Sequence, residues 1–504
     1  MEERKIRIIG AGVAGLCAGI YARLNGYEAE IHESHSVPGG LCTGWRRSGY
    51  AFDGCIHWLL GASPSSPFHK YWTELGVLPA TRIDVYDEFL RSECKDGRTV
   101  VLHADADRLG DHLSALSPDD AGRIAELVRL IKSAARMPMP LDKPMGLMSP
   151  REILGLVRSF SPYGKDMAFL TGTSIGKYAL DFRHPGIRRA LCAVIPPDHY
   201  LLALVFTLAD YHGRNAGFPV GGSLALAQTL ADRFRALGGV LHLGSRVRRI
   251  LVERQGLSHR ARGLLLEDGT EAPADTVISA ADGRTTIYDL LGGAFRNRKI
   301  DALYKDPLKY RTYTSVQVSF GVNADLSGEP GLVDVPMTES LCIGDRAVNR
   351  LLFKVYRPEW GLAPAGKTVV ASGILSSYEH WNALRRSRSA YTGEKNRIAD
   401  AVRRELELRF PAASGRIETT DVATPLTYER YTGVWKGAYM AWMPTPETGR
   451  IQPPDTLPGL RDFHQVGMWA LPAGIPVGAV TGRWVIQKLC RRDGREFRTG
   501  AEGV

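Results

Sequence analysis

The sequence contains few cysteines and no metal-binding arrangement of them. Its seven cysteines lie far apart along 504 residues, and no pair has the C-x-x-C spacing. This excludes the common zinc and iron–sulfur motifs. An odd, scattered set is typical of reduced, buried thiols rather than of a disulfide framework. We therefore expect no metal site and a cytoplasmic protein.

Long hydrophobic runs are also missing. The longest apolar segment, YLLALVFTLA at residues 200–209, has ten residues, whereas a membrane-spanning helix needs roughly twenty. It predicts a buried helix. Residues 1–9, MEERKIRII, lead directly into a strand, so we expect no signal peptide. The chain has no internal repeats and no low-complexity segment, and 44% hydrophobic with 23% charged residues indicates a globular protein.

Concentrated positive charge is missing as well. The formal net charge is +10, but the basic clusters are short, separated along the chain, and not interleaved with aromatic residues. Nucleic-acid binding usually requires a basic patch or stripe. We therefore expect no nucleic-acid partner.

What the chain does have is a nucleotide-binding pattern at its start. An apolar strand at residues 6–9 is followed by Gly10, Gly12 and Gly15 in the spacing G-x-G-x-x-G, and Glu33 ends a second strand 18 residues beyond Gly15. Such glycines let the backbone approach a pyrophosphate at the positive end of a helix. A carboxylate at this place binds ribose hydroxyls and repels a 2′-phosphate, so the pattern predicts FAD or NAD rather than NADP.

Two later features favour FAD. Adjacent glycines, Gly39 and Gly40, follow Glu33 closely and allow the backbone to run beside an extended cofactor. Near the other end, Ala473, Gly474 and Pro476 predict a tight turn before a helix over about 477–489. The positive end of that helix would stabilise the negative charge of reduced flavin.

Four separated segments resemble one family. They are the opening segment with FDGCIHWLLG, FPVGGSLALAQTLADRFRALGG at 218–239, TPLTYERYTGVWKGAYMAW at 424–442, and FHQVGMWALPAGIPVGAVTGRWVIQKLC at 463–490. The chain is similar to the phytoene desaturase, carotenoid isomerase and retinol saturase branch of the flavin amine-oxidase-like superfamily. The resemblance implies an FAD site formed by Gly10, Gly12, Ala14, Gly15, Glu33, Ser34, Gly39, Gly40, Leu41, Val247, Ala280, Gly467, Ile475, Pro476 and Val477.

The implied fold class is α/β with an α+β substrate domain. A GR2-type Rossmann-like FAD-binding domain would comprise residues 1–75, 215–299 and 421–504. A substrate domain of helices and a mainly antiparallel sheet would comprise residues 76–214 and 300–420. Within them we expect a hairpin at 82–104, helices at 105–136, 150–159 and 382–409, and a meander at 246–272. An apolar loop at 137–150, MPMPLDKPMGLMSP, is expected to guard a substrate or membrane entrance.

The resemblance also implies an FAD-dependent oxidoreductase that transfers hydride to or from a hydrophobic polyene or isoprenoid-like substrate. Desaturation, saturation and isomerisation remain open. His57, in a segment like F-D-x-G-x-H-Y-x-G of retinol saturases, is either the proton donor or acceptor or a support for the flavin loop. Asp53 is expected to fix that loop, and Trp58, Tyr211 and Tyr431 to contact substrate.

Two other functions are compatible with this fold. One is a flavin amine or porphyrinogen oxidase. The other is a non-catalytic prenyl-binding chaperone similar to the Rab GDP-dissociation inhibitors, which lack a working flavin site. Because the polyene substrates of the resembled family live in bilayers, a peripheral membrane contact is a further expectation.

Overall fold

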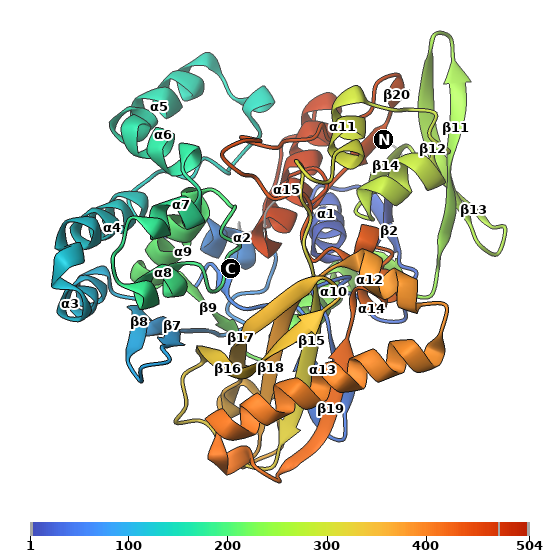
Figure 1. The fold of residues 1–504 in the computed structure, drawn as a ribbon. Coiled ribbons are helices and arrows are strands. Elements are labelled where there is room, and N and C mark those ends of the chain that lie inside the picture. The colour runs from blue at the N-terminus through green and yellow to red at the C-terminus, as the bar shows by residue number, and fades with distance from the viewer. Residues whose placement is uncertain (1–3, 472–473, 501–504) are drawn as a thin grey trace.

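The computed structural model describes residues 4–471 and 474–500. At its centre lies a five-stranded parallel sheet in the order β10-β2-β1-β14-β21 (Figure 1). Its strands are β1 (Lys5–Ile9), β2 (Glu28–His32), β10 (Val240–His242), β14 (Thr276–Ser279) and β21 (Phe463–Gln465). The sheet thus joins segments from the beginning, middle and end of the chain.

Three helices pack together at this sheet: α1 (Val13–Leu24), α10 (Gly222–Ala236) and α15 (Ile475–Arg492). Ten of the twelve residues of α1 are buried, because the helix lies between the sheet and its two neighbours. The expected C-terminal helix is confirmed and is longer at both ends than predicted. The expected turn residue Ala473 lies outside the described residues.

A meander extends from this centre, as predicted. It consists of β11 (Val247–Gln255), β12 (Ser258–Leu266) and β13 (Glu271–Pro273), and the short β20 (Leu460–Arg461) pairs with β12. The predicted turn at Asp268 and Gly269 is present, with Gly269 at φ +89°. A second turn, at Gly256 with φ +62°, connects β11 to β12.

The other large sheet has seven strands in the order β19-β15-β18-β17-β16-β7-β8. They are β7 (Glu88–Glu93), β8 (Thr99–His103), β15 (Thr314–Val322), β16 (Leu332–Ile343), β17 (Arg346–Val355), β18 (Thr368–Ser376) and β19 (Ile417–Ala423). All pairs are antiparallel except β16 with β7. This confirms a mainly antiparallel sheet. The hairpin predicted at 82–104 is present only in its later part, as β7 and β8, because Ile83–Val85 form the separate strand β6, which pairs with β9 (Ala216–Pro219).

Helix α13 (Arg388–Arg409) covers one face of this sheet (Figure 1). The apolar side chains between them form a core separate from that of the parallel sheet. The expected helix over 382–409 is in fact two helices, α12 (Tyr378–Leu384) and α13, because Ser387 caps a new helix by accepting the backbone N–H of Ala390. The domain boundary predicted at residue 420 falls inside β19; the other boundaries stay predictions.

Seven further helices form a group on one side of the molecule (Figure 1). They are α3 (Ala106–Leu116), α4 (Ala121–Ala134), α5 (Pro150–Phe160), α6 (Gly164–Gly172), α7 (Ile175–Leu180), α8 (Pro185–Leu191) and α9 (Leu201–His212). The helical pattern predicted over 105–136 is present as two helices, because Pro118 has no N–H to continue α3 and a 3-10 turn separates α3 from α4. The buried helix expected at 200–209 is α9. Among the described residues, no helix combines the length and apolarity required for a membrane span.

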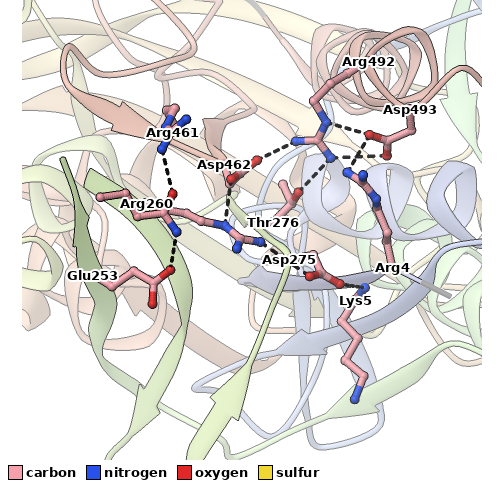
Figure 2. A network of polar contacts seen from close by, with 11 residues as sticks. Arg4, Lys5, Glu253, Arg260, Asp275, Thr276, Arg461, Asp462, Arg492 and Asp493 are labelled. Atoms are coloured by element: carbon pink, nitrogen blue, oxygen red, sulfur yellow. Dashed lines mark hydrogen bonds and ion pairs between the residues drawn. The ribbon is translucent and has the colours of Figure 1, made fainter. Parts of the chain in front are cut away.

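A polar network fastens the first strand to the last helix (Figure 2). Asp462, just before β21, accepts bonds from Arg260 of β12 at 2.9 Å and from Arg492 of α15 at 2.7 Å. Arg4 pairs with Asp493 at 2.7 Å. These contacts hold the two ends of the chain together beside the parallel sheet.

Candidate active site

The glycine turn after β1 has the geometry of a phosphate cradle. Gly10 has φ +93°, and a Cβ on Gly15 would lie 2.0 Å from the carbonyl oxygen of Gly10. Only glycine fits at both positions. Helix α1 begins next to this turn with Gly12 as its N-cap and no side chain capping its first N–H groups. Those groups and the helix dipole can therefore bind a pyrophosphate.

Glu33 lies at the end of β2, beside the turn. Its side chain accepts the backbone N–H of Ala11 at 2.7 Å and that of His35 at 2.8 Å, and Ser34 donates to it at 3.3 Å. These bonds fix the carboxylate beside the glycine turn, where a contact with ribose is expected. The backbone of Ser245, two residues before Val247, donates to the Glu33 carbonyl at 2.8 Å, which places the start of β11 at the same end of the site.

The second glycine pair packs against the first turn. Gly39 donates its N–H to the Ala11 carbonyl at 2.8 Å, and it has φ +119°, where a Cβ would meet the Cys42 carbonyl oxygen at 2.3 Å. A Cβ on Gly40 would lie 3.4 Å from the Gly12 Cα. The two glycine segments thus approach each other closely with no side chain between them, and the half-buried Leu41 follows.

The C-terminal segment closes the site from the other side. Gly467, at φ +87°, lies so near α1 that its Cβ would be 3.2 Å from the Ala14 Cβ. Helix α15 starts at Ile475, with Pro476 in its first turn and Val477 half-buried beside it. Ala280, directly after β14, donates to the Ile9 carbonyl at 2.9 Å and borders the Gly15 position. The glycine turn, the carboxylate expected to bind ribose and the N-terminus of α15 together fit FAD.

The loop after the cofactor glycines is held by Asp53, the last residue of β4 (Tyr50–Asp53). One carboxylate oxygen accepts the backbone N–H groups of Cys55 and Ile56, both at 3.0 Å, and the other accepts that of Ser223 at 2.6 Å. Asp53 is buried. The prediction that it fixes the loop is confirmed by these bonds.

His57 follows in this loop and faces a cavity. Its side chain is exposed at the cavity but lies deep in the molecule, and these surroundings, with a smaller effect of the Lys354 charge, lower the pKa of His57 to about 3. The imidazole is therefore neutral near pH 7. A neutral ring can hydrogen-bond to a ligand but is a weak acid.

The cavity itself is narrow and mainly aromatic. It contains about 290 Å³ of space, including its open mouth. The rings of Trp58, Phe89 and Tyr211 contact one another, with centroids 4.9 to 6.2 Å apart, and Tyr86 stacks on Tyr211 at 5.9 Å. The lining residues are His57, Trp58, Tyr86, Glu88, Phe89, Tyr211, Gly331, Leu332 and Lys354. Such walls suit a flat, apolar ligand.

The structure places Trp58 and Tyr211, which are both expected to contact substrate, at one cavity, and Tyr431 elsewhere. Tyr431 is 45% exposed and packs edge-on against His35 at 5.3 Å, near Glu33 rather than in the cavity.

Sequence reasoning missed Tyr86, Phe89 and Lys354. For Lys354 a signal exists: it interrupts the apolar run LLFKVY at 351–356, where a strand residue is expected to be buried. Phe89 lies on β7 and Tyr86 in the short connection before it, and no sequence pattern distinguishes either residue.

A group with metal-ligand chemistry lies outside this site. Within the described residues, Glu30, His32 and His242 offer atoms within 4.8 Å of one another. However, the two imidazole rings stack nearly parallel, with centroids 4.6 Å apart, so their in-plane lone pairs do not converge. Glu30 also pairs with Arg7 at 3.0 Å. This geometry does not favour a shared metal ion.

Comparison with known proteins agrees with the geometry of the cradle. The family model described as flavin containing amine oxidoreductase matches residues 13–483. Among curated proteins, the chain is 23% identical to the chloroplastic prolycopene isomerase of Arabidopsis thaliana over 86% of this chain and 73% of the relative. It is 22% identical to the neurosporene-forming phytoene desaturase of Cereibacter sphaeroides over 96% and 93%.

Solved structures share the fold. An oxidoreductase from Methanosarcina mazei has a TM-score of 0.58 at 19% identity, covering 96% of this chain and all of that one (100%). Cyclohexylamine oxidase from Brevibacterium oxydans has a TM-score of 0.61 at 13% identity, covering 98% and 100%.

Proposed function

The chain belongs to the flavin-containing amine oxidoreductase family, and we propose that this FAD-dependent oxidoreductase acts on a hydrophobic polyene or isoprenoid-like substrate by hydride transfer to or from the flavin. The observation that carries the substrate class is the aromatic cavity formed by Trp58, Tyr86, Phe89 and Tyr211. His57, on the loop that continues from the cofactor glycines, is one of its lining residues.

The residues of the chain have distinct tasks in this proposal. When bound, FAD supplies the acceptor or donor of the hydride. Trp58 and Tyr211 hold the conjugated chain flat and exclude water, which favours an apolar over a polar substrate. Asp53 keeps the His57 loop in place through its three backbone bonds. The neutral His57 imidazole can donate or accept one hydrogen bond at the cavity wall.

The experiment is an anaerobic flavin titration. A conjugated polyene substrate should bleach the absorbance of oxidised flavin if the enzyme desaturates, and should reoxidise the prereduced enzyme if it saturates double bonds. An isomerase should change the substrate only while the flavin is reduced. Oxygen consumption with amines or porphyrinogens would support the oxidase alternative. Protein that is colourless and does not retain added FAD would support the prenyl-binding chaperone.

A finer part of the proposal is that the protein is cytoplasmic and touches a membrane surface. Helix α5 has no buried residue, and Met145, Ile153, Leu154 and Val157 expose 38 to 61% of their surface. In Figure 1 this helix lies at the outer edge of the helical group. An exposed apolar helix face flanked by arginines suits the boundary of an anionic bilayer. Because α5 directly follows the loop at 137–150, membrane contact of α5 would place this loop at the surface from which an apolar substrate enters.

A further inference from the structure

Lys354 is a buried ammonium group without a carboxylate partner in the described part of the chain. Its side chain is 4% exposed. The Nζ atom donates to the carbonyl oxygens of Ile56 at 2.5 Å and His57 at 3.2 Å, and it lies 4.4 Å from the ring centroid of Phe218. Among residues 4–471 and 474–500, Lys354 forms no ion pair. Burying an unpaired charge is costly. Here two carbonyl oxygens and the ring faces of Phe218 and Tyr356 surround the Nζ atom, but no anion of the described residues does.

The position of Lys354 on β17 points it toward the cavity. Leu351, Phe353 and Val355 alternate onto the face that packs with α13, whereas Leu352 and Lys354 lie on the opposite face. Lys354 pairs in register with Leu332 of β16, and both residues line the cavity.

The charges around Lys354 leave it available to a ligand. Glu88 also lines the cavity, but it is bound to Arg91 by two bonds of 2.6 and 2.9 Å. The Asp53 carboxylate is occupied by the backbone N–H groups of its own loop and of Ser223. An ammonium group has three donors, and two are used by Ile56 and His57.

We propose that Lys354 binds a carboxylate at the end of the substrate, so that the substrate is a conjugated apolar chain with an acidic terminus rather than a pure hydrocarbon. This inference rests on the proposed function and narrows its substrate class. The third donor of Lys354 forms a charge-assisted hydrogen bond with the carboxylate, while Trp58 and Tyr211 contact the polyene chain. The bound carboxylate then supplies the anion that the buried ammonium group lacks within the described part of the protein.

A purely structural role for Lys354 predicts something different. In that case Lys354 would only hold the carbonyl groups of Ile56 and His57, and its removal would weaken the loop without changing which ligands bind. The test must therefore measure ligand preference.

The experiment measures binding of a fluorescent tetraene acid, trans-parinaric acid, and of the tetraene hydrocarbon with the same chain, to the FAD-loaded protein. We expect the wild type to bind the acid at least about tenfold more tightly than the hydrocarbon. In Lys354→Met this preference should vanish while the affinity for the hydrocarbon changes less than about threefold. Lys367→Met is the matched control, because Lys367 pairs with Glu418 at 2.7 Å away from the cavity; it should keep the preference.

A second readout on the wild type remains if Lys354→Met does not fold. Burial lowers the pKa of Lys354 to about 7, against the opposing effect of the nearby Asp53 charge. The ammonium form is therefore lost as the pH rises through about 7, and acid binding should weaken there while hydrocarbon binding stays constant. Around Lys354, His57 is already neutral, and burial raises the pKa of Tyr86, Tyr211 and Tyr356.

Equal affinity of the wild type for acid and hydrocarbon would overturn the proposal, as would a Lys354→Met protein that keeps the preference. Neither result depends on turnover. FAD content, measured in parallel, separates failure of this inference from failure of the proposed function.

Discussion

At the scale of single residues, His57 is the site residue whose role can be tested most directly. The sequence left it as proton donor, proton acceptor or loop support. Its pKa of about 3 keeps the ring neutral across the range in which enzymes usually work. A general acid needs a pKa near the working pH, so we expect His57 to act by hydrogen bonding and loop support.

The expected result for His57→Gln follows from this. Glutamine keeps a hydrogen-bonding side chain, so turnover should fall less than about tenfold, compared with the hundredfold or more expected for a lost general acid. Because the pKa of the His57 imidazole is about 3, the pH–rate profile of the wild type should show no change caused by His57 between about pH 5 and 8. A limb near 6.5 that disappears in His57→Gln, in a steady-state pH profile, would contradict this.

At the scale of elements, the contact between α1 and α15 can be tested through one glycine. A Cβ on Gly482 would lie 2.7 Å from the Ala18 backbone nitrogen, whereas nothing lies within 4 Å of a Cβ on Gly155 of α5. Gly482→Ala should therefore push the helices apart and cost about 1–3 kcal/mol of unfolding free energy, with loss of FAD. Gly155→Ala, the matched control, should stabilise α5 by up to about 1 kcal/mol. Thermal unfolding and the flavin-to-protein ratio measure both.

The exposed face of α5 gives a second prediction at this scale. The triple variant Ile153→Ser, Leu154→Ser and Val157→Ser should lower binding to vesicles of anionic lipid at least about tenfold, since each buried apolar side chain contributes more than about 1 kcal/mol. Sedimentation with vesicles measures it. The control replaces Leu257, Leu308 and Leu408 with serine; these are even more exposed, at 104, 82 and 65%, but lie elsewhere in the fold. An equal loss of vesicle binding in both triple variants would indicate nonspecific hydrophobic binding instead of a membrane-docking face on α5.

At the scale of the whole molecule, the sequence predicted the cofactor half better than the substrate half. Gly10, Gly15 and Gly39 were recognisable because their backbone conformations and close contacts admit only glycine. Lys354 and Phe89 were not, since they meet His57 through β17 and β7, strands more than 200 residues apart in sequence that join one sheet only in the fold. Local patterns encode turns and helix ends, whereas the walls of a cavity depend on tertiary pairing.

At the same scale, two polar contacts join the C-terminal segment to the rest of the molecule, and they differ in how deeply they are buried. The network around Asp462 is partly exposed, with side-chain exposures of 24% for Asp462 and 34% for Arg492, so water and salt weaken it. The pair Arg483–Glu74 is almost fully buried, with exposures of 5% and 2% at 2.9 Å, and Tyr21 also donates to Glu74 at 2.7 Å. Losing one partner of a buried pair leaves an uncompensated charge.

Matched carboxylate-to-amide substitutions compare the two contacts. Glu74→Gln should lower the free energy of unfolding by about 3 kcal/mol, and the loss should change little with salt, because Arg483 stays buried and charged. Asp462→Asn should cost about 1 kcal/mol or less, and less still at high salt; asparagine also tolerates the positive φ of +56° at this position. Urea unfolding of both variants at low and high salt measures the difference. A larger loss for Asp462→Asn would mean that the surface network of Figure 2, and not the buried pair, joins α15 to the rest of the cofactor site.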